Sequence, residues 1–173
     1  MNTGCRRAAR GWSPRPRWRV EAIRALRRLG LIRPAELLPL LSDGSGAVTR
    51  AAVVALRHHI GNLDPALFEA LLTPDNASHV RFAGYRLLTG GDTWQRLATN
   101  LALVDDPDLR LRAGSRADIA NWLERQAATT YRAPDPARAG SLARLIEQAR
   151  PVLGGPKTRL LRFHAGLGTG PGR

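Results

Sequence analysis

The sequence predicts an all-α fold, a right-handed α-solenoid built from stacked helix pairs in repeats of about 31 residues. Arginine recurs at that interval, with small residues after it, at Arg50, Arg81 and Arg112. Leucine and proline columns share the interval: Leu41, Leu72 and Leu103, and Pro34 and Pro65. Apolar residues follow helical spacing between turn-rich segments, and no useful stretch alternates apolar and polar residues as a half-buried strand does.

Residues 1–17 are strongly basic and precede the first leucine-rich helix. They contain no leucine, so we interpret them either as a flexible basic arm or as a truncated upstream repeat of a longer solenoid. Arginines alternate with tryptophans here, which is a pattern suited to phosphate contacts and base stacking. The residues that would contact nucleic acid are Arg6, Arg7, Arg10, Trp12, Arg15, Arg17 and Trp18.

Residues 18–127 are predicted to form the repeats, each with two helices. The first helix opens on proline, which the first turn tolerates, and Asp64 can cap the helix that starts at Pro65. The second helix carries the arginine column and small residues such as Ala52, Ala83 and Gly114, where crossing backbones can approach closely. Stacking would bury the apolar face of each unit on the next.

The C-terminal part reads differently from the repeats. Residues 128–140 include the turn-rich segment RAPDPARAG and are predicted to be a linker. Residues 141–167 are predicted to form capping helices that cover the open end of the stack. Residues 168–173 are predicted to be a disordered tail.

Composition narrows the class of protein. The chain has 173 residues and a formal net charge of +13, yet residues 34–127 hold nine arginines against eleven acidic residues. The basic charge therefore belongs mainly to the two ends. The single cysteine, Cys5, cannot form an internal disulfide, and no apolar run reaches the roughly 20 residues of a membrane span. We expect a cytoplasmic protein with no membrane partner.

These repeats resemble the HEAT-repeat family, and more narrowly its short bacterial form, the phycobilisome-lyase-type HEAT-like repeats. The resemblance is carried by an Asp in the turn of each unit and an Arg early in the second helix. The resemblance implies that these residues form a hydrogen-bonded ladder between neighbouring units: Asp43, Asp75 and Asp106 with Arg50, Arg81 and Arg112. The arginine column is then structural.

Each residue group that resembles a catalytic or cofactor-binding motif is explained more simply by a structural role or by the absence of the elements that the motif needs. His58 and His59 are adjacent, so on a helix they point about 100° apart and do not share a metal ion comfortably. Asp105, Asp106 and Asp108 fit one repeat's turn and helix cap. The glycine-rich GLGTGPG segment lacks the strand and helix of a phosphate loop. We expect no enzyme activity, no metal site and no cofactor.

The function we expect is that of a non-catalytic scaffold that binds an unidentified protein partner through its second helices. Tyrosine and arginine are typical of interface hot spots, and the candidate contacts are Arg57, His58, Tyr85, Arg86 and Arg116. The alternative is a nucleic-acid-binding solenoid that resembles the alkylpurine DNA glycosylases, with Asp118 and Trp122 on one helix face. A bilin-lyase-like accessory role follows from family analogy alone. The oligomeric state stays open.

Overall fold

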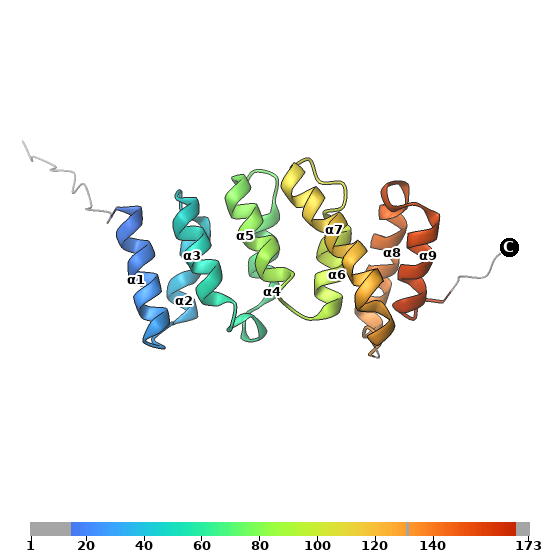
Figure 1. Ribbon diagram of the computed structural model, residues 1–173, viewed down its shortest axis with the longest axis horizontal. Helices are drawn as coiled ribbons and strands as arrows, with labels where there is room; N and C mark the ends of the chain where they lie inside the picture. Colours follow the sequence, from blue (N-terminus) through green and yellow to red (C-terminus); the bar gives the residue numbers. More distant parts are fainter. Residues whose placement is uncertain (1–14, 131, 169–173) are drawn as a thin grey trace, which may run out of the picture.

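The computed structural model describes residues 15–130 and 132–168, and all regular structure in these residues is helical. The helices follow one another across the molecule roughly in chain order (Figure 1). They are α1 (Pro16–Arg28), α2 (Pro34–Leu37), α3 (Gly46–Leu56), α4 (Pro65–Glu69), α5 (Ser78–Leu88), α6 (Thr93–Ala102), α7 (Leu109–Arg125), α8 (Pro136–Leu153) and α9 (Gly155–His164). Short 3₁₀ segments lie at Leu38–Ser42, Ile60–Asn62, Ala70–Leu72 and Ala127–Thr129. The prediction of an all-α chain is confirmed.

The predicted second helices are α3, α5 and α7, and each carries one arginine of the column. Helix α3 packs against α1 on one side and α5 on the other, while α4 packs on α5 and α6 packs on α7. Helix α8 contacts α6 and α9. The molecule is therefore a row of neighbouring helix pairs, with α1 as a single helix at its N-terminal end (Figure 1).

The first helices α2 and α4 begin as predicted but span only four and five residues. Pro34 and Pro65 occupy first-turn positions, and the Asp64 carboxylate accepts the backbone N–H of Ala66 at 2.9 Å. Helix α2 changes to 3₁₀ geometry at Leu38, next to Pro39, which has no N–H to donate to an α-helical hydrogen bond.

Close helix crossings depend on small residues, as the sequence predicts. A Cβ atom added to Gly84 would lie 2.7 Å from the carbonyl oxygen of Phe68, so α5 meets the backbone of α4 directly. Ala52 and Ala83 are buried in the same layer. The apolar column of the second helices is also buried, at Leu56, Leu87 and Ile119.

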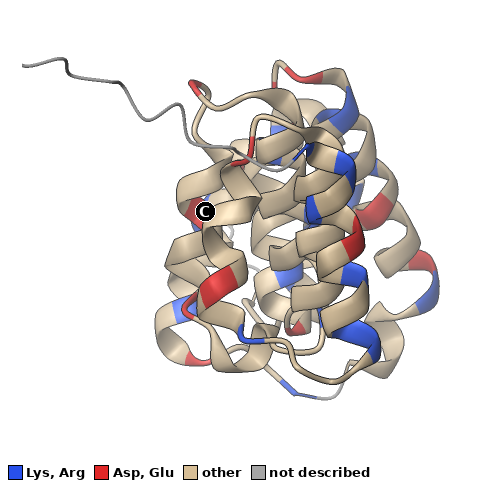
Figure 2. Ribbon diagram, turned by 90° about the vertical axis from the view of Figure 1, so that its left-hand side faces the viewer, with Lys and Arg blue, Asp and Glu red and all other residues tan. Residues whose placement is uncertain are grey.

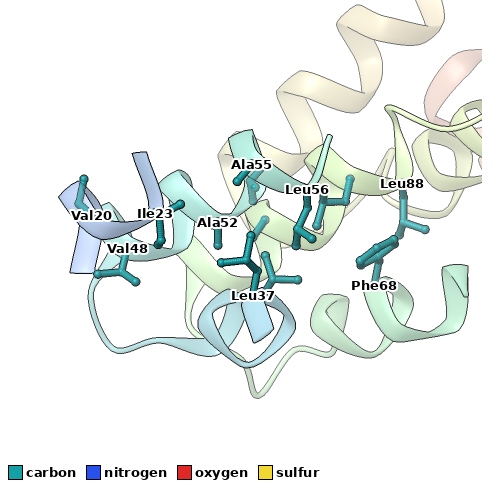
Figure 3. Packing of buried hydrophobic residues seen from close by; sticks show 13 residues of the cluster. Val20, Ile23, Leu37, Val48, Ala52, Ala55, Leu56, Phe68 and Leu88 are labelled. Carbon is teal, nitrogen blue, oxygen red and sulfur yellow. The ribbon is translucent and has the colours of Figure 1, made fainter. Parts of the chain in front are cut away.

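The core consists of two large apolar clusters. The first joins α1 to α5 and includes Val20, Ile23, Val48, Leu56 and Phe68, which converge between the helices (Figure 3). The second joins α6 to α9 and is formed by Trp94, Leu97, Leu101, Val104, Ile119, Trp122, Ala127, Leu142, Ile146, Ala149, Leu161 and Ala165. A small third cluster of Tyr85, Leu103 and Leu111 lies between them.

The ends depart from the predicted boundaries. Helix α1 begins at Pro16, inside the predicted arm of residues 1–17, because Val20 and Ile23 pack into the first cluster. Helix α8 begins at Pro136, inside the predicted linker of residues 128–140, because Asp135 caps it by accepting the N–H of Arg138. The capping helices therefore start before residue 141.

Most of the predicted arm and tail falls outside the described residues. This applies to Cys5 and to the nucleic-acid candidates Arg6, Arg7, Arg10 and Trp12, as well as to residues 169–173. Between residues 15 and 168, leaving out 131, no helix is both long enough and apolar enough to cross a membrane.

Candidate binding surface of the second helices

The predicted ladder has one fully buried rung. The guanidinium of Arg81 on α5 holds the Asp106 carboxylate with two hydrogen bonds, Nη1 to Oδ1 at 3.1 Å and Nη2 to Oδ2 at 2.6 Å. Both side chains are 7% exposed. Arg81 also donates from Nε to the carbonyl oxygen of Leu72 at 3.0 Å. This arginine joins two neighbouring units and is structural.

A second rung forms two units further towards the N-terminus. Arg19 on α1 pairs with Asp43 at 3.0 Å. Asp43 and Asp106 each accept the backbone N–H of the residue two places later at 2.8 Å, so both turns present their carboxylate in the same way. Arg112 donates to the carbonyl oxygen of Asp106 at 3.0 Å and thereby supports its own turn.

The ladder expected between neighbouring units has no rung at Arg50 and Asp75. Both residues are exposed, and neither makes an ion pair or side-chain hydrogen bond within the described part of the chain. The turn is instead closed by Asn76, whose amide donates to two carbonyl oxygens at 3.1 Å each. His79 links the two units, with Nε2 2.9 Å from the carbonyl oxygen of Asp43. Arg50 is thus left at the surface.

The predicted partner contacts divide into three kinds. Tyr85 is buried and its hydroxyl donates to Asn100 Oδ1 at 3.0 Å, so the prediction of a surface contact is wrong for this residue. Its ring packs in the small third cluster, on the side of α5 that faces α6 and α7.

The other predicted partner contacts are exposed. Arg116 is held by hydrogen bonds to the carbonyl oxygen of Val104 at 2.8 Å and to Asp105 at 3.3 Å. The remaining three predicted contacts, Arg57, His58 and Arg86, are exposed and make no ion pair in the described chain.

Tyr85 belongs to a polar network that crosses the junction of α5, α6 and α7. Asn100 donates to Asp118 and to the carbonyl oxygen of Arg96, and Arg96 holds both oxygens of Asp118. Arg96 also donates to Gln126 at 3.2 Å. Burial, followed by the negative charge of Asp118, raises the pKa of the Tyr85 hydroxyl, which therefore stays protonated at neutral pH.

This network removes the basis of the likeness to DNA glycosylases. Asp118 is fully engaged by Arg96 and Asn100, and Trp122 is 2% exposed with its ring 6.2 Å from that of Trp94. The space that Asp118 and Trp122 line has no room for a water molecule. An extruded base therefore could not enter between Asp118 and Trp122.

The surface of the second helices contains three openings. The first lies between α1 and α3 and has a volume of about 360 Å³. Its floor is apolar and its rim is basic; the lining residues are Val20, Ile23, Arg24, Arg27, Ala47, Arg50, Ala51 and Val54. We call this opening the α1–α3 groove.

The second opening, the α3–α5 groove, has a volume of about 260 Å³ and shares Arg50 and Val54 with the first. Arg86 and Arg110 complete its basic rim, and the guanidinium carbon of Arg110 lies 3.5 Å from the centre of the Phe82 ring. The third opening, the Arg57–Arg86 pocket, has a volume of about 250 Å³ and shares Arg86 with the second. Each opening thus adjoins the next through the residues that they share.

Charge is separated along the repeats. Helices α3 and α5 contain no acidic residue. The acidic residues of the repeats lie mostly in turns and at helix N-caps, including Asp43, Asp64, Asp92, Asp106 and Asp108. The near-neutral total of residues 34–127 therefore combines two helices that carry arginine and no acidic residue with turns that hold most of the acidic residues; in Figure 2, blue basic positions recur along the helices on the right, with red acidic positions among them.

Sequence reasoning missed Val54, although a signal for it exists. Arg50, Val54 and Arg57 are spaced by four and then three residues, which puts them on one face of α3. Val54 is 46% exposed, so this face offers an apolar side chain between two arginines. Phe82 and Arg86 have the same four-residue spacing on α5.

Two further observations bear on the kind of site. No group of three or more His, Cys, Asp or Glu residues placed to hold a metal ion occurs in residues 15–130 and 132–168. Asp106 and Asp108 serve the turn and the N-cap of α7, as predicted. Comparisons of the chain with protein-family models, with curated proteins and with solved structures give no match.

Proposed function

We propose that the chain is a short right-handed α-solenoid of HEAT-like helix pairs and acts as a non-catalytic docking module in the cytoplasm. Its partner is an acidic protein segment that also carries apolar side chains. The observation that carries this proposal is the combination of apolar floors and arginine rims in the α1–α3 and α3–α5 grooves.

The lining of the two grooves favours a protein segment as the occupant. Apolar side chains of the segment would lose contact with water against Val54 and Ile23. Its carboxylates would meet Arg50 and Arg86, which make no ion pair in the described residues. A phosphate backbone needs the arginines but gains nothing from an apolar floor, so the grooves suit a peptide better.

Nucleic acid is the second candidate, and one observation favours it. Trp18 on α1 is 56% exposed, and the guanidinium carbon of Arg17 lies 4.9 Å from the centre of its ring. An exposed tryptophan among arginines is able to stack on an unpaired base. Arg15 is exposed beside them and completes the described part of the predicted basic arm.

A peptide-display selection against the purified chain tests the proposal. We expect enrichment of peptides that combine acidic and apolar residues. Their binding should be lost in Val54→Asp and in Arg50→Glu, because these residues line both grooves. Leu67→Asp and Arg125→Glu are matched controls, since Leu67 is 47% exposed on α4 and Arg125 is exposed without an ion pair in the described chain. Peptides that bind all four variants equally would contradict the proposal.

Fluorescence anisotropy with random duplex and single-stranded DNA and RNA at two salt concentrations tests the second candidate. Binding at physiological salt with a steep salt dependence, lost on deletion of residues 1–17, would support it. Unchanged binding after that deletion would exclude a role for the arm.

A further inference from the structure

The Arg57–Arg86 pocket differs in chemistry from the two grooves beside it. Its lining is predominantly polar and consists of Arg57, Tyr85, Arg86, Thr89, Gly90, Arg96 and Asp118. Arg57 is the C-cap residue that follows α3, and Arg86 lies in the last turn of α5. The pocket therefore lacks the valine and isoleucine floor that fits an apolar side chain in the α1–α3 groove.

The charges in this pocket do not cancel. Arg96 and Asp118 neutralise each other through their paired hydrogen bonds. Tyr85 stays protonated and contributes no charge, as its raised pKa requires. Arg57 and Arg86 have no acidic partner in the described chain. Two guanidinium groups are thus left uncompensated around an opening of about 250 Å³.

The other polar groups of the lining are already committed. The Thr89 hydroxyl donates to the carbonyl oxygen of Tyr85 at 2.8 Å, and the Gly90 N–H donates to the carbonyl oxygen of Leu87 at 3.1 Å. The Tyr85 hydroxyl donates to Asn100. Arg96 already uses three of its five N–H groups on Asp118 and Gln126, so Arg57 and Arg86 are the lining arginines whose guanidinium groups make no side-chain hydrogen bond in the described residues and keep all their donors for a ligand.

We propose that the Arg57–Arg86 pocket binds the phosphoryl group of a phosphorylated side chain carried by the segment that fills the neighbouring α3–α5 groove. This inference rests on the proposed docking function. A phosphate monoester carries a charge of about −1.5 to −2 at pH 7, which matches two arginines, whereas a carboxylate leaves one of them unpaired. Arginine also pairs with phosphate through two parallel hydrogen bonds.

Continuity with the groove identifies the source of the phosphoryl group. Arg86 lines both the α3–α5 groove and the pocket, so the two openings adjoin at this residue and a segment that lies in the groove passes beside the pocket. The occupant is therefore a phosphorylated residue of the same acidic segment, and free phosphate in solution is a competitor for the same two arginines.

A ¹H–¹⁵N NMR titration of the full chain, following the arginine Nε signals, tests this inference. The probes are N-acetyl-O-phosphoserine amide, N-acetyl-glutamate amide and inorganic phosphate at constant ionic strength. We expect saturable shifts of the Arg57 and Arg86 signals with phosphoserine. Its affinity should be about tenfold or more above that of glutamate, because the phosphoryl group makes additional charge-assisted hydrogen bonds and each of them adds to the binding free energy. Affinity should fall at pH 5, where the phosphoryl group, with a second pKa of about 6, loses charge.

A charge-matched pair of double variants provides the control. Arg57→Gln with Arg86→Gln should lose phosphoserine binding, while Arg125→Gln with Arg159→Gln keeps it, because the latter arginines are exposed and lie outside all three openings. Equal affinity for phosphoserine and glutamate, binding of inorganic phosphate alone, or binding that survives in the first pair overturns the inference. If phosphoserine fails while display-selected acidic peptides still bind, only the phosphoryl site is lost and the docking function stands.

Discussion

Arginines that share one sequence column serve different purposes in this protein. Arg81 is buried and holds both oxygens of Asp106, whereas Arg50, one repeat earlier, is exposed and forms no rung with Asp75. The difference arises in the turn that follows, because the Asp106 carboxylate is fixed by a backbone N–H, and the corresponding turn uses the amide of Asn76. Position in the repeat therefore does not by itself define the role of a residue.

A pair of alanine substitutions measures this difference. Arg81→Ala should lower the free energy of unfolding by about 3–5 kcal/mol, because it leaves the Asp106 carboxylate buried without its partner. Arg50→Ala should change it by less than about 0.5 kcal/mol, as for an exposed position. Urea denaturation followed by circular dichroism gives both values. Equal losses in the two variants would show that the column acts as a uniform ladder.

Packing of one helix on another depends here on the absence of a side chain. Helix α5 crosses α4 at Gly84, where the carbonyl oxygen of Phe68 leaves no room for a methyl group. Helix α7 approaches Tyr85 at Gly114 in a similar but looser way, with 3.3 Å between an added Cβ and the hydroxyl oxygen. The distance between neighbouring helices is thus set by the close approach of their backbones as well as by the burial of apolar side chains.

Alanine at two glycines should therefore have opposite effects. Gly84→Ala should destabilise the fold by about 1–3 kcal/mol, because the new methyl group must push α5 away from α4. Gly61→Ala should be neutral or stabilise by up to about 1 kcal/mol, since nothing lies within 4 Å of the added atom. Thermal unfolding scans of both variants test the pair. A stable Gly84→Ala protein would mean that the two helices are able to separate at no cost.

The sequence predicts the helices of the repeats better than it predicts the C-terminal helices or the contacts between helix pairs. The interval placed Leu56, Leu87 and Ile119 in the core because identical packing recurs in each unit. It missed the start of α8, where capping by Asp135 is a local effect without a repeat. It also took Tyr85 for a surface residue, since the polar network that buries it comes from a different helix pair.

At the scale of the whole molecule, the core is divided. In the described residues, the junction between the apolar clusters of α1–α5 and α6–α9 contains the small third cluster, the buried Arg81–Asp106 pair, and the polar network of Tyr85, Asn100, Arg96 and Asp118. Hydrogen bonds at this junction depend on geometry, whereas apolar contacts tolerate small movements. The two halves of the row are therefore coupled mainly through a few directional bonds.

Asn100→Ala should weaken this coupling, because it leaves Tyr85 and Asp118 each without one buried partner. In a background with Trp12→Phe and Trp18→Phe, tryptophan fluorescence reports on α6–α9 through the buried Trp94 and Trp122, while circular dichroism reports on all helices. We expect the two unfolding curves to coincide in the natural chain and to separate in the variant. Asn62→Ala, at an exposed position, is the control. Coincident curves in both variants would mean that the halves unfold as one unit.

Arg86 lines two adjoining openings, so the binding of a ligand in one opening affects the binding of a ligand in the other. A carboxylate and a phosphoryl group on separate molecules would compete for the same guanidinium, so each would weaken the binding of the other reciprocally. The same two groups on one chain avoid that penalty in part, because the second contact forms at the high effective concentration set by the first. The surface would thus discriminate between partners by how their charges are connected, in addition to how many they carry.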